Sequence, residues 1–196
     1  MSYPQDQIIA AFEHLLAPRP PKDLGCKRIS PKGMLDEAFE FISSDLGMFT
    51  DSLKAAAALR ITTPTSDPPH FVDVGCGIGT KLVAAHSILR YSYQITGIEY
   101  FKPYAKVAKA LTENQPDTHI IIGNALQQSY EAYDIIYFYC PMSDRAKEVK
   151  LECRIIATAK PGALFIPFRP SYDWQGDPRV ALVYKNRTVE IWGKKC

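Results

Sequence analysis

The apolar residues of this chain fall into short runs that alternate with segments of helical periodicity. Five of the runs have the length of a single buried strand: 70–74, 94–99, 118–122, 133–139 and 163–167. Segments in which apolar residues recur with helical spacing separate several of them: 81–89, 102–113 and 144–159. Strands that alternate with helices are typical of a parallel sheet covered on both faces, so the pattern predicts an α/β fold.

The last part of the chain has a different pattern. Apolar runs at 179–184 and 188–192 flank the polar segment 185–187, which predicts an antiparallel hairpin. The stretch between Pro167 and Pro178 is short for a helix, and we expect it to be mostly loop. The complete prediction is a Rossmann-like, doubly wound and mostly parallel sheet of seven strands that ends in this hairpin.

The N-terminal part of the chain is predicted to be a helical extension. Helical periodicity covers 7–16, and two further helices are expected at 33–43 and 51–60. Clusters of proline interrupt the chain after the first of these helices and again just before the first strand. The extension is too short for a core of its own, so we expect residues 1–69 to pack on the sheet of a domain formed by residues 70–196.

The first strand leads into a glycine-rich turn, with Gly75, Gly77 and Gly79 in alternation. A dinucleotide fingerprint requires a glycine three residues after the second one, and that position is Thr80. Asp73 at the strand end also disfavours a pyrophosphate, because its carboxylate would repel the anion. S-adenosylmethionine is a cationic ligand without a phosphate, and it suits this turn better.

The run at 73–79, Asp-Val-Gly-Cys-Gly-Ile-Gly, resembles the first motif of the class I methyltransferases. The resemblance covers about residues 70–192 and implies that S-adenosylmethionine is the methyl donor. It also implies that this loop, including Cys76, holds the methionine part of the donor. A glycine-rich turn with no ligand is the alternative.

The ends of the second and third strands supply further candidates. Glu99 ends the second strand at the separation expected of a carboxylate that accepts hydrogen bonds from both ribose hydroxyls, with Tyr100 beside it. The resemblance places an acidic residue or an asparagine after the third strand to bind the adenine amine, which here implies Asn124 and the adjacent Ala125. A solvated loop acid and an asparagine selected for turn geometry are the alternatives.

The fourth strand ends in Tyr139-Cys140-Pro141, where the resemblance places the meeting point of methyl donor and acceptor. Alternate side chains of a strand point to opposite faces, so only one face of this strand can reach the pocket. Tyr139 is the candidate catalytic residue, Cys140 and Pro141 are candidates for donor contact, and Tyr137 and Phe138 are expected in the core. An aromatic ring that packs on the sheet edge is the alternative for Tyr139.

The segments 136–142 and 161–168 are similar, more loosely, to the ATP-synthase c-subunit type of protein-lysine methyltransferases and to the non-SET histone lysine methyltransferases. In those families a helix that begins with a threonine-containing turn precedes the first strand. This similarity implies that Thr50 contacts the methionine part of the donor. It also implies a protein lysine as methyl acceptor.

Composition limits the remaining possibilities. The chain has 196 residues, 46% of them hydrophobic, which is enough for one good core. A net charge of +2 is too mild to indicate binding to a polyanion, so nucleic acid is not expected as a partner.

No apolar run is long enough to cross a bilayer, and the N-terminal residues match neither a signal peptide nor a transit peptide, so a cytoplasmic protein is expected. Five cysteines without a Cys-x-x-Cys pair favour free thiols, and no metal site is expected.

These observations predict an S-adenosylmethionine-dependent methyltransferase that works without a metal on a protein lysine or on a small molecule. A catalytically silent module that binds the donor and a partner is the first alternative. A nicotinamide oxidoreductase is the second, and the Gly79-Thr80 spacing disfavours it.

Overall fold

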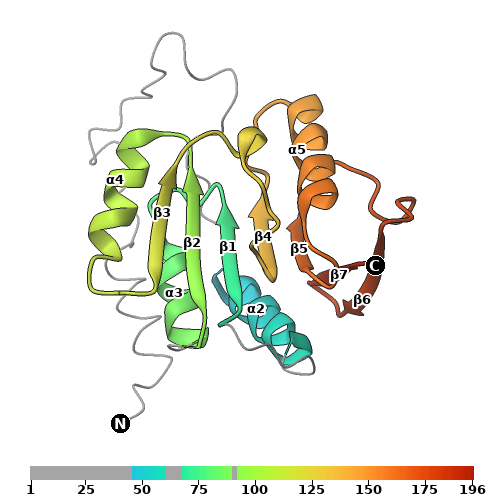
Figure 1. The fold of residues 1–196 in the computed structure, drawn as a ribbon, viewed down its shortest axis with the longest axis horizontal. Helices are drawn as coiled ribbons and strands as arrows, with labels where there is room; N and C mark the ends of the chain where they lie inside the picture. The colour runs from blue at the N-terminus through green and yellow to red at the C-terminus, as the bar shows by residue number, and fades with distance from the viewer. Residues whose placement is uncertain (1–45, 61–67, 90–91) are drawn as a thin grey trace. The chain divides into compact units, whose positions relative to one another are not determined.

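The apolar runs form one mixed sheet of seven strands in the computed structural model, which describes residues 46–60, 68–89 and 92–196 (Figure 1). The strands are β1 (His70–Val74), β2 (Gln94–Glu99), β3 (Thr118–Ile122), β4 (Ile135–Tyr139), β5 (Leu164–Phe168), β6 (Val180–Lys185) and β7 (Glu190–Lys194). Their order across the sheet is β3-β2-β1-β4-β5-β7-β6. Strands β1 to β5 are parallel, and β7 is antiparallel to both of its neighbours. The predicted fold class is therefore confirmed.

Helices cover both faces of this sheet. They are α2 (Leu46–Arg60), α3 (Thr80–Leu89), α4 (Lys102–Leu111) and α5 (Arg145–Thr158), with a short 3₁₀ helix η1 (Ala125–Gln127) after β3. Helices α2, α3 and α4 contribute to the core on one face, and α5 contributes to the core on the other. This arrangement follows from the strand pattern, because a strand that is apolar on both sides must be covered on both sides.

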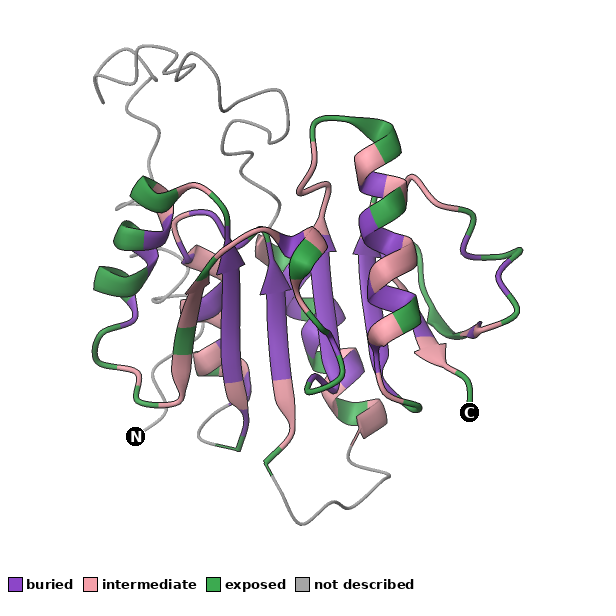
Figure 2. Ribbon diagram, turned by 45° about the horizontal axis from the view of Figure 1, so that its top comes forward, coloured by how far each residue is buried: buried purple, intermediate pink, exposed green. Residues whose placement is uncertain are grey.

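The centre of the core lies on β1 and β4, which are buried along almost their whole length (Figure 2). Successive residues of a strand point to opposite faces, so these strands contribute to the core on both faces. On the α2 and α3 face, the Phe49 ring packs against Phe71 and Tyr137, with centroid separations of 6.2 and 4.9 Å. On the α5 face, Phe138 packs against Trp174. The expectation that Tyr137 and Phe138 are core residues is confirmed, since their exposed fractions are 1% and 0%.

Helix α2 includes residues 46–50, which lie before the predicted start at 51. Its last residue, Arg60, forms an ion pair with Asp134, which also pairs with Lys160 and accepts the backbone N–H of His70. The buried Asp134 thus ties the end of α2 to the starts of β1 and β4. The helices predicted at 7–16 and 33–43 lie outside the described residues, and the domain boundary after residue 69 stays a prediction.

The C-terminal hairpin lies one to two residues further along the chain than predicted. Asn186 explains the shift, because its side-chain oxygen accepts the backbone N–H groups of Thr188 and Val189 and so draws these residues into the turn. The stretch between β5 and β6 is loop, as expected. The buried Glu152 of α5 orders this loop by accepting the backbone N–H of Ser171 and the indole N–H of Trp174.

Gly97 lies in the middle of β2, where Cys76 of the glycine-rich turn and Leu82 of α3 pack against this strand. A Cβ at this position would lie 2.6 Å from both the Cys76 sulfur and Leu82 Cδ1. The close approach brings the turn against β2, and only glycine leaves enough space for it.

We expect Gly97→Ala to destabilise the protein by about 1–3 kcal/mol, because it overpacks a buried contact. Urea unfolding measures the effect. Gly123→Ala is the matched control, since a Cβ there meets only the end of the flexible Gln128 side chain at 3.2 Å. Equal stability of the two variants would contradict the claim that only glycine fits at position 97.

Candidate active site

The glycine-rich turn lies at the carboxyl end of β1, between the ends of β2 and β4. The backbone N–H groups of Gly75 and Cys76 both donate to the carbonyl of Ile98 on β2. The φ of Gly75 is +80°, and a Cβ there would lie 2.7 Å from that of Pro141 after β4. Two neighbouring loops therefore meet at the turn, and Pro141 packs on Gly75, while the expected contact of Pro141 with the donor stays a prediction.

Gly79 closes the same turn with a φ of +86°. A Cβ there would lie 2.9 Å from that of Ala108, so α4 packs directly on the turn. Gly77 has a φ of +57° and lies between these two contacts. The alternating glycines give the turn a backbone that L side chains rarely adopt and leave its amides close to the strand ends.

Glu99 is buried at the end of β2, with an exposed fraction of 8%. One carboxylate oxygen accepts the backbone N–H of Gly77 at 2.8 Å, and the other accepts that of Phe101 at 2.7 Å. Burial raises the pKa of Glu99, and the backbone donors, Tyr100 among them, oppose that effect. The carboxylate therefore links β2 to the glycine turn, a structural role that its spacing in the sequence does not indicate. Tyr100 itself is 40% exposed.

Asp73 is buried in β1 next to the turn, with an exposed fraction of 1%. Its Oδ2 atom has no hydrogen-bond partner. Burial raises its pKa to about 6, while the charge of Lys81 lowers that pKa and the charge of Glu99 raises it. An unpartnered buried carboxylate destabilises a fold, so the atom is suited to a ligand that donates to it.

Asn124 follows β3 and begins η1. Its side-chain oxygen accepts the backbone N–H of Leu126 at 2.9 Å, which is the turn role that was the alternative from sequence. Ala125 is buried, and its carbonyl accepts the hydroxyl of Tyr130. The backbone N–H of Gly123 donates to the Glu99 carbonyl, so this segment lies next to the end of β2.

Tyr139 ends β4 on the same face as Tyr137. The Lys81 ammonium lies 5.8 Å from the centroid of the Tyr139 ring, and the Arg169 guanidinium carbon also lies 5.8 Å from it. Cys140 follows, and its thiol donates to the carbonyl of Arg169 at 3.3 Å. Two cations therefore lie near the Tyr139 ring, at the strand end where the resemblance places the reaction.

Thr50 is buried in α2, with an exposed fraction of 8%. Because α2 includes residues 46–50, Thr50 lies inside the helix and not in its first turn, in contrast to the predicted start of this helix at 51. Its neighbour Phe49 packs on Tyr137, which places this turn of α2 over β4.

No protein-family model and no curated protein matches the sequence. Solved structures match it in fold. An RNA methyltransferase from Salinibacter ruber, in complex with S-adenosylhomocysteine, has a TM-score of 0.56 at 14% identity, over 77% of this chain and 91% of its own. TrmN from Thermus thermophilus has a TM-score of 0.52 at 18% identity, over 71% of this chain and 48% of its own, so this chain spans about half of that protein. The chain has the fold of the class I methyltransferases.

Two cations beside Tyr139 were not recognised from the sequence. Lys81 lies in the first turn of α3, where a positive charge opposes the helix dipole, and that conflict is the signal that could have identified it. Arg169 carried no such signal, because its place beside Tyr139 depends on the pairing of β4 with β5.

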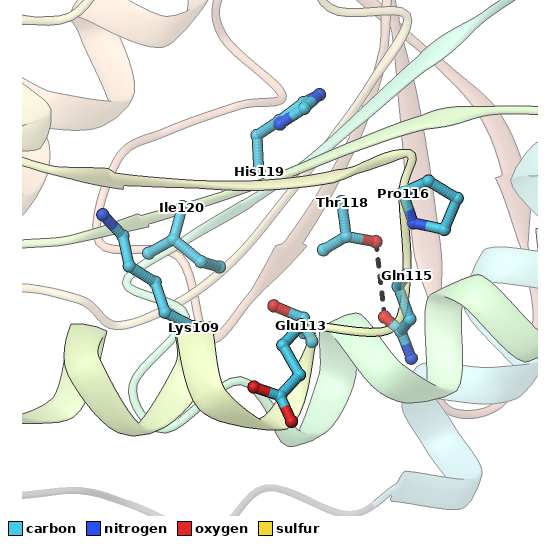
Figure 3. A pocket seen from close by; sticks show the side chains of 8 residues that line it. Lys109, Glu113, Gln115, Pro116, Thr118, His119 and Ile120 are labelled. Carbon is cyan, nitrogen blue, oxygen red and sulfur yellow. Dashed lines mark hydrogen bonds between the residues drawn. The ribbon is translucent and has the colours of Figure 1, made fainter.

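A pocket of about 400 Å³ lies away from the strand ends of this methyltransferase fold (Figure 3). It is formed by the C-terminal part of α4, the segment after it and the start of β3, whereas the glycine turn follows the carboxyl end of β1. Its lining residues are Lys109, Thr112, Glu113, Gln115, Pro116, Thr118, His119 and Ile120. None of the residues predicted from sequence to bind the donor belongs to it.

The described residues contain no group of three or more histidine, cysteine or acidic residues placed to hold a metal ion. Among the same residues, none of the helices has the length and apolar character needed to span a membrane. Cys76, Cys140, Cys153 and Cys196 are free thiols.

We expect Asp73→Asn to stabilise the protein in a pH-dependent manner. Folding raises the pKa of Asp73 from 3.8 to about 6. Ionisation of Asp73 therefore lowers the free energy of unfolding progressively as the pH rises from 3.8 to about 6, and above this range the loss is about 3 kcal/mol. The stability gain of Asp73→Asn should therefore be about 2 kcal/mol larger near pH 8 than near pH 4.5.

Urea unfolding at both pH values measures this difference. Asp51→Asn, at an exposed position of α2, is the control for the removal of a carboxylate. A gain that is the same at both pH values would show that Asp73 is not held in an ionised, penalised form.

Proposed function

We propose that this chain is an S-adenosylmethionine-dependent methyltransferase that transfers the methyl group directly to its acceptor without a metal. The observation that carries the proposal is the unpartnered Oδ2 of Asp73, buried beside the glycine turn. The cofactor supplies an activated methyl group when bound, and the protein's task is to align it with the acceptor. Support comes from the fold, whose solved relatives include a methyltransferase in complex with S-adenosylhomocysteine.

Asp73 and Lys81 fit the amino-acid end of this donor, which carries an ammonium and a carboxylate. The charge of Lys81 acts on Asp73, yet the two side chains form no ion pair. A zwitterion bound between them would donate to the free Oδ2 and accept from the Lys81 ammonium. Both charges of the amino-acid end would then be paired, and the partner of its ammonium, Asp73, is buried, which is where pairing matters most.

The nucleoside end fits the ends of β2 and β3. The Glu99 carboxylate accepts backbone N–H groups of Gly77 and Phe101, and Tyr100 also acts on it. A carboxylate has about four acceptor sites, so the ribose hydroxyls can bind there while the turn stays fixed. The Asn124 oxygen is used by Leu126, which leaves its amide N–H groups for adenine. Tyr100, Ala125 and the turn residues Gly75, Cys76, Gly77 and Gly79 would surround the donor, with Thr50 and Pro141 nearby.

The reaction itself is assigned to the end of β4. Tyr139 would position the acceptor, and its π face would favour the positive charge of the sulfonium. Burial raises the pKa of the Cys140 thiol, and the charge of Glu148 raises it further. A neutral thiol is a poor nucleophile, so we assign Cys140 to the support of the strand end and not to covalent catalysis.

The identity of the acceptor is the least constrained part of the proposal. A charged lysine would approach Tyr139 near two cations, Lys81 and Arg169, which repel it. The site therefore supports a small molecule better than the protein lysine implied by the looser resemblance. The Salinibacter ruber relative is an RNA methyltransferase, but the net charge of +2 does not favour a nucleic acid here. We retain residues 70–196 as the donor-binding domain and residues 1–69 as its extension.

Calorimetry with S-adenosylhomocysteine tests the donor site of the full chain. We expect the wild type to bind, and Glu99→Gln to bind about 10- to 100-fold more weakly, because a glutamine carbonyl cannot replace both charged acceptors. Glu131→Gln, at an exposed position outside the site, is the matched control and should bind like the wild type.

Absence of wild-type binding at millimolar ligand would refute the proposal, and binding of NADH instead would favour the oxidoreductase. Binding without methyl transfer to any fraction of a cell extract would favour the silent module.

A further inference from the structure

The two strand ends next to Tyr139 carry an unusual backbone. Cys140 follows β4 with a φ of +40°, and Arg169 follows β5 with a φ of +50°. They are the only non-glycine residues with positive φ in the described part of the chain. Such residues are disfavoured by about 1–3 kcal/mol each, and they concentrate at functional sites.

Contacts between the two strand ends hold this backbone in place. The Cys140 thiol donates to the carbonyl of Arg169 at 3.3 Å and lies 3.6 Å from that of Phe168. The Phe168 ring in turn lies against Tyr139, with a centroid separation of 6.2 Å. The result is that the Arg169 side chain, on an exposed residue, is turned back over Tyr139.

Among the residues that the structure describes, the guanidinium of Arg169 has no anionic partner. None of the ion pairs or hydrogen bonds in this part of the chain includes its side-chain nitrogens, and the guanidinium lies over the Tyr139 ring. The contrast is with Arg179, whose Nε and Nη2 both donate to the carboxylate of Asp177 two residues away. Arg169 is therefore positioned by the fold, yet its planar set of N–H donors is unused.

We propose that the methyl acceptor is a small anionic molecule whose carboxylate or phosphate group binds Arg169 while its nucleophilic atom lies beside Tyr139. The inference rests on the proposed function. An arginine fork matches both anions with two parallel hydrogen bonds, and its fixed orientation would align the acceptor with the methyl group. Lys81, whose ammonium also lies 5.8 Å from the centroid of this ring, belongs to the donor in this arrangement.

The charge distribution favours a small acceptor over a polyanion. Binding along a nucleic acid requires a stripe of basic side chains, since each phosphate contact adds to the affinity. Within the described residues, Tyr139 has only Lys81 and Arg169 over its ring. One free arginine fits one anionic group.

The first experiment identifies the charge of the acceptor. The full chain is incubated with radiolabelled S-adenosylmethionine and a cell extract that has been separated into polymer, anion-exchange-bound and unbound small-molecule fractions. We expect label in the bound small molecules. Treatment with alkaline phosphatase then separates the two sources: loss of acceptance indicates a phosphate monoester, and its persistence indicates a carboxylate.

The second experiment tests Arg169 with that bound fraction as acceptor. Arg169→Gln should raise the apparent KM for the acceptor about 10- to 100-fold and also lower kcat, because it removes both a charged hydrogen-bonding group and the alignment that this group gives. Arg169→Gly should raise KM as well, but without a loss in melting temperature, since glycine relieves the positive φ. Arg187→Gln, at an exposed position in the turn after β6, is the matched control.

Label that enters only the unbound small molecules or the polymers would overturn the inference, as would an unchanged KM in both Arg169 variants. S-adenosylhomocysteine affinity separates this failure from failure of the proposed function. If the wild type binds this compound and the acceptor is neutral or polymeric, only the anionic acceptor is wrong. If the wild type does not bind it, the methyltransferase proposal fails and this inference fails with it.

Discussion

The buried carboxylate of Glu99 is the interaction on which the site depends. It joins the end of β2 to the glycine turn through Gly77 and to the start of α4 through Phe101. Charged hydrogen bonds of this kind are stronger than neutral ones, and burial protects them from water. The turn carries three glycines and has little side-chain packing of its own, so this carboxylate and the Ile98 carbonyl fix its shape. Without them the backbone would lose the position from which a ligand can approach it.

The two halves of the site are built by different means. The donor half is formed by backbone at strand ends, where glycine permits close approach, and the fold fixes it tightly. The acceptor half is formed by side chains, Tyr139 and Arg169, on strand ends with a disfavoured backbone. Pro141 joins the halves, because it packs directly on Gly75. A displacement of the end of β4 would therefore also displace the glycine turn, through the contact of Pro141 with Gly75.

Several features of the site destabilise the fold and are offset elsewhere. Asp73 is buried with an unpartnered oxygen, Lys81 opposes the dipole of α3, and Cys140 has a positive φ. Below them the core is closely packed, with Phe49, Phe71 and Tyr137 in ring contact. Destabilising groups that gather at one end of a well-packed sheet are a common property of binding sites, because the same groups become satisfied when ligand is bound.

The sequence by itself determined the strands, their parallel arrangement, the glycine turn and the acid after β2, because these depend on local periodicity and on spacing along the chain. It also placed Tyr139 at the end of β4, since strand ends are visible as the limits of apolar runs. It did not reveal that Glu99 accepts the backbone N–H of Gly77 in the turn or that Gly97 leaves space for Cys76 and Leu82. Nor did it reveal that Asn186 shifts the hairpin. Nor did it bring Lys81 and Arg169 to one ring, although they are far apart in the chain. Such contacts arise only when β4 pairs with β1 and β5 and α3 packs on their face, so tertiary structure alone decided them.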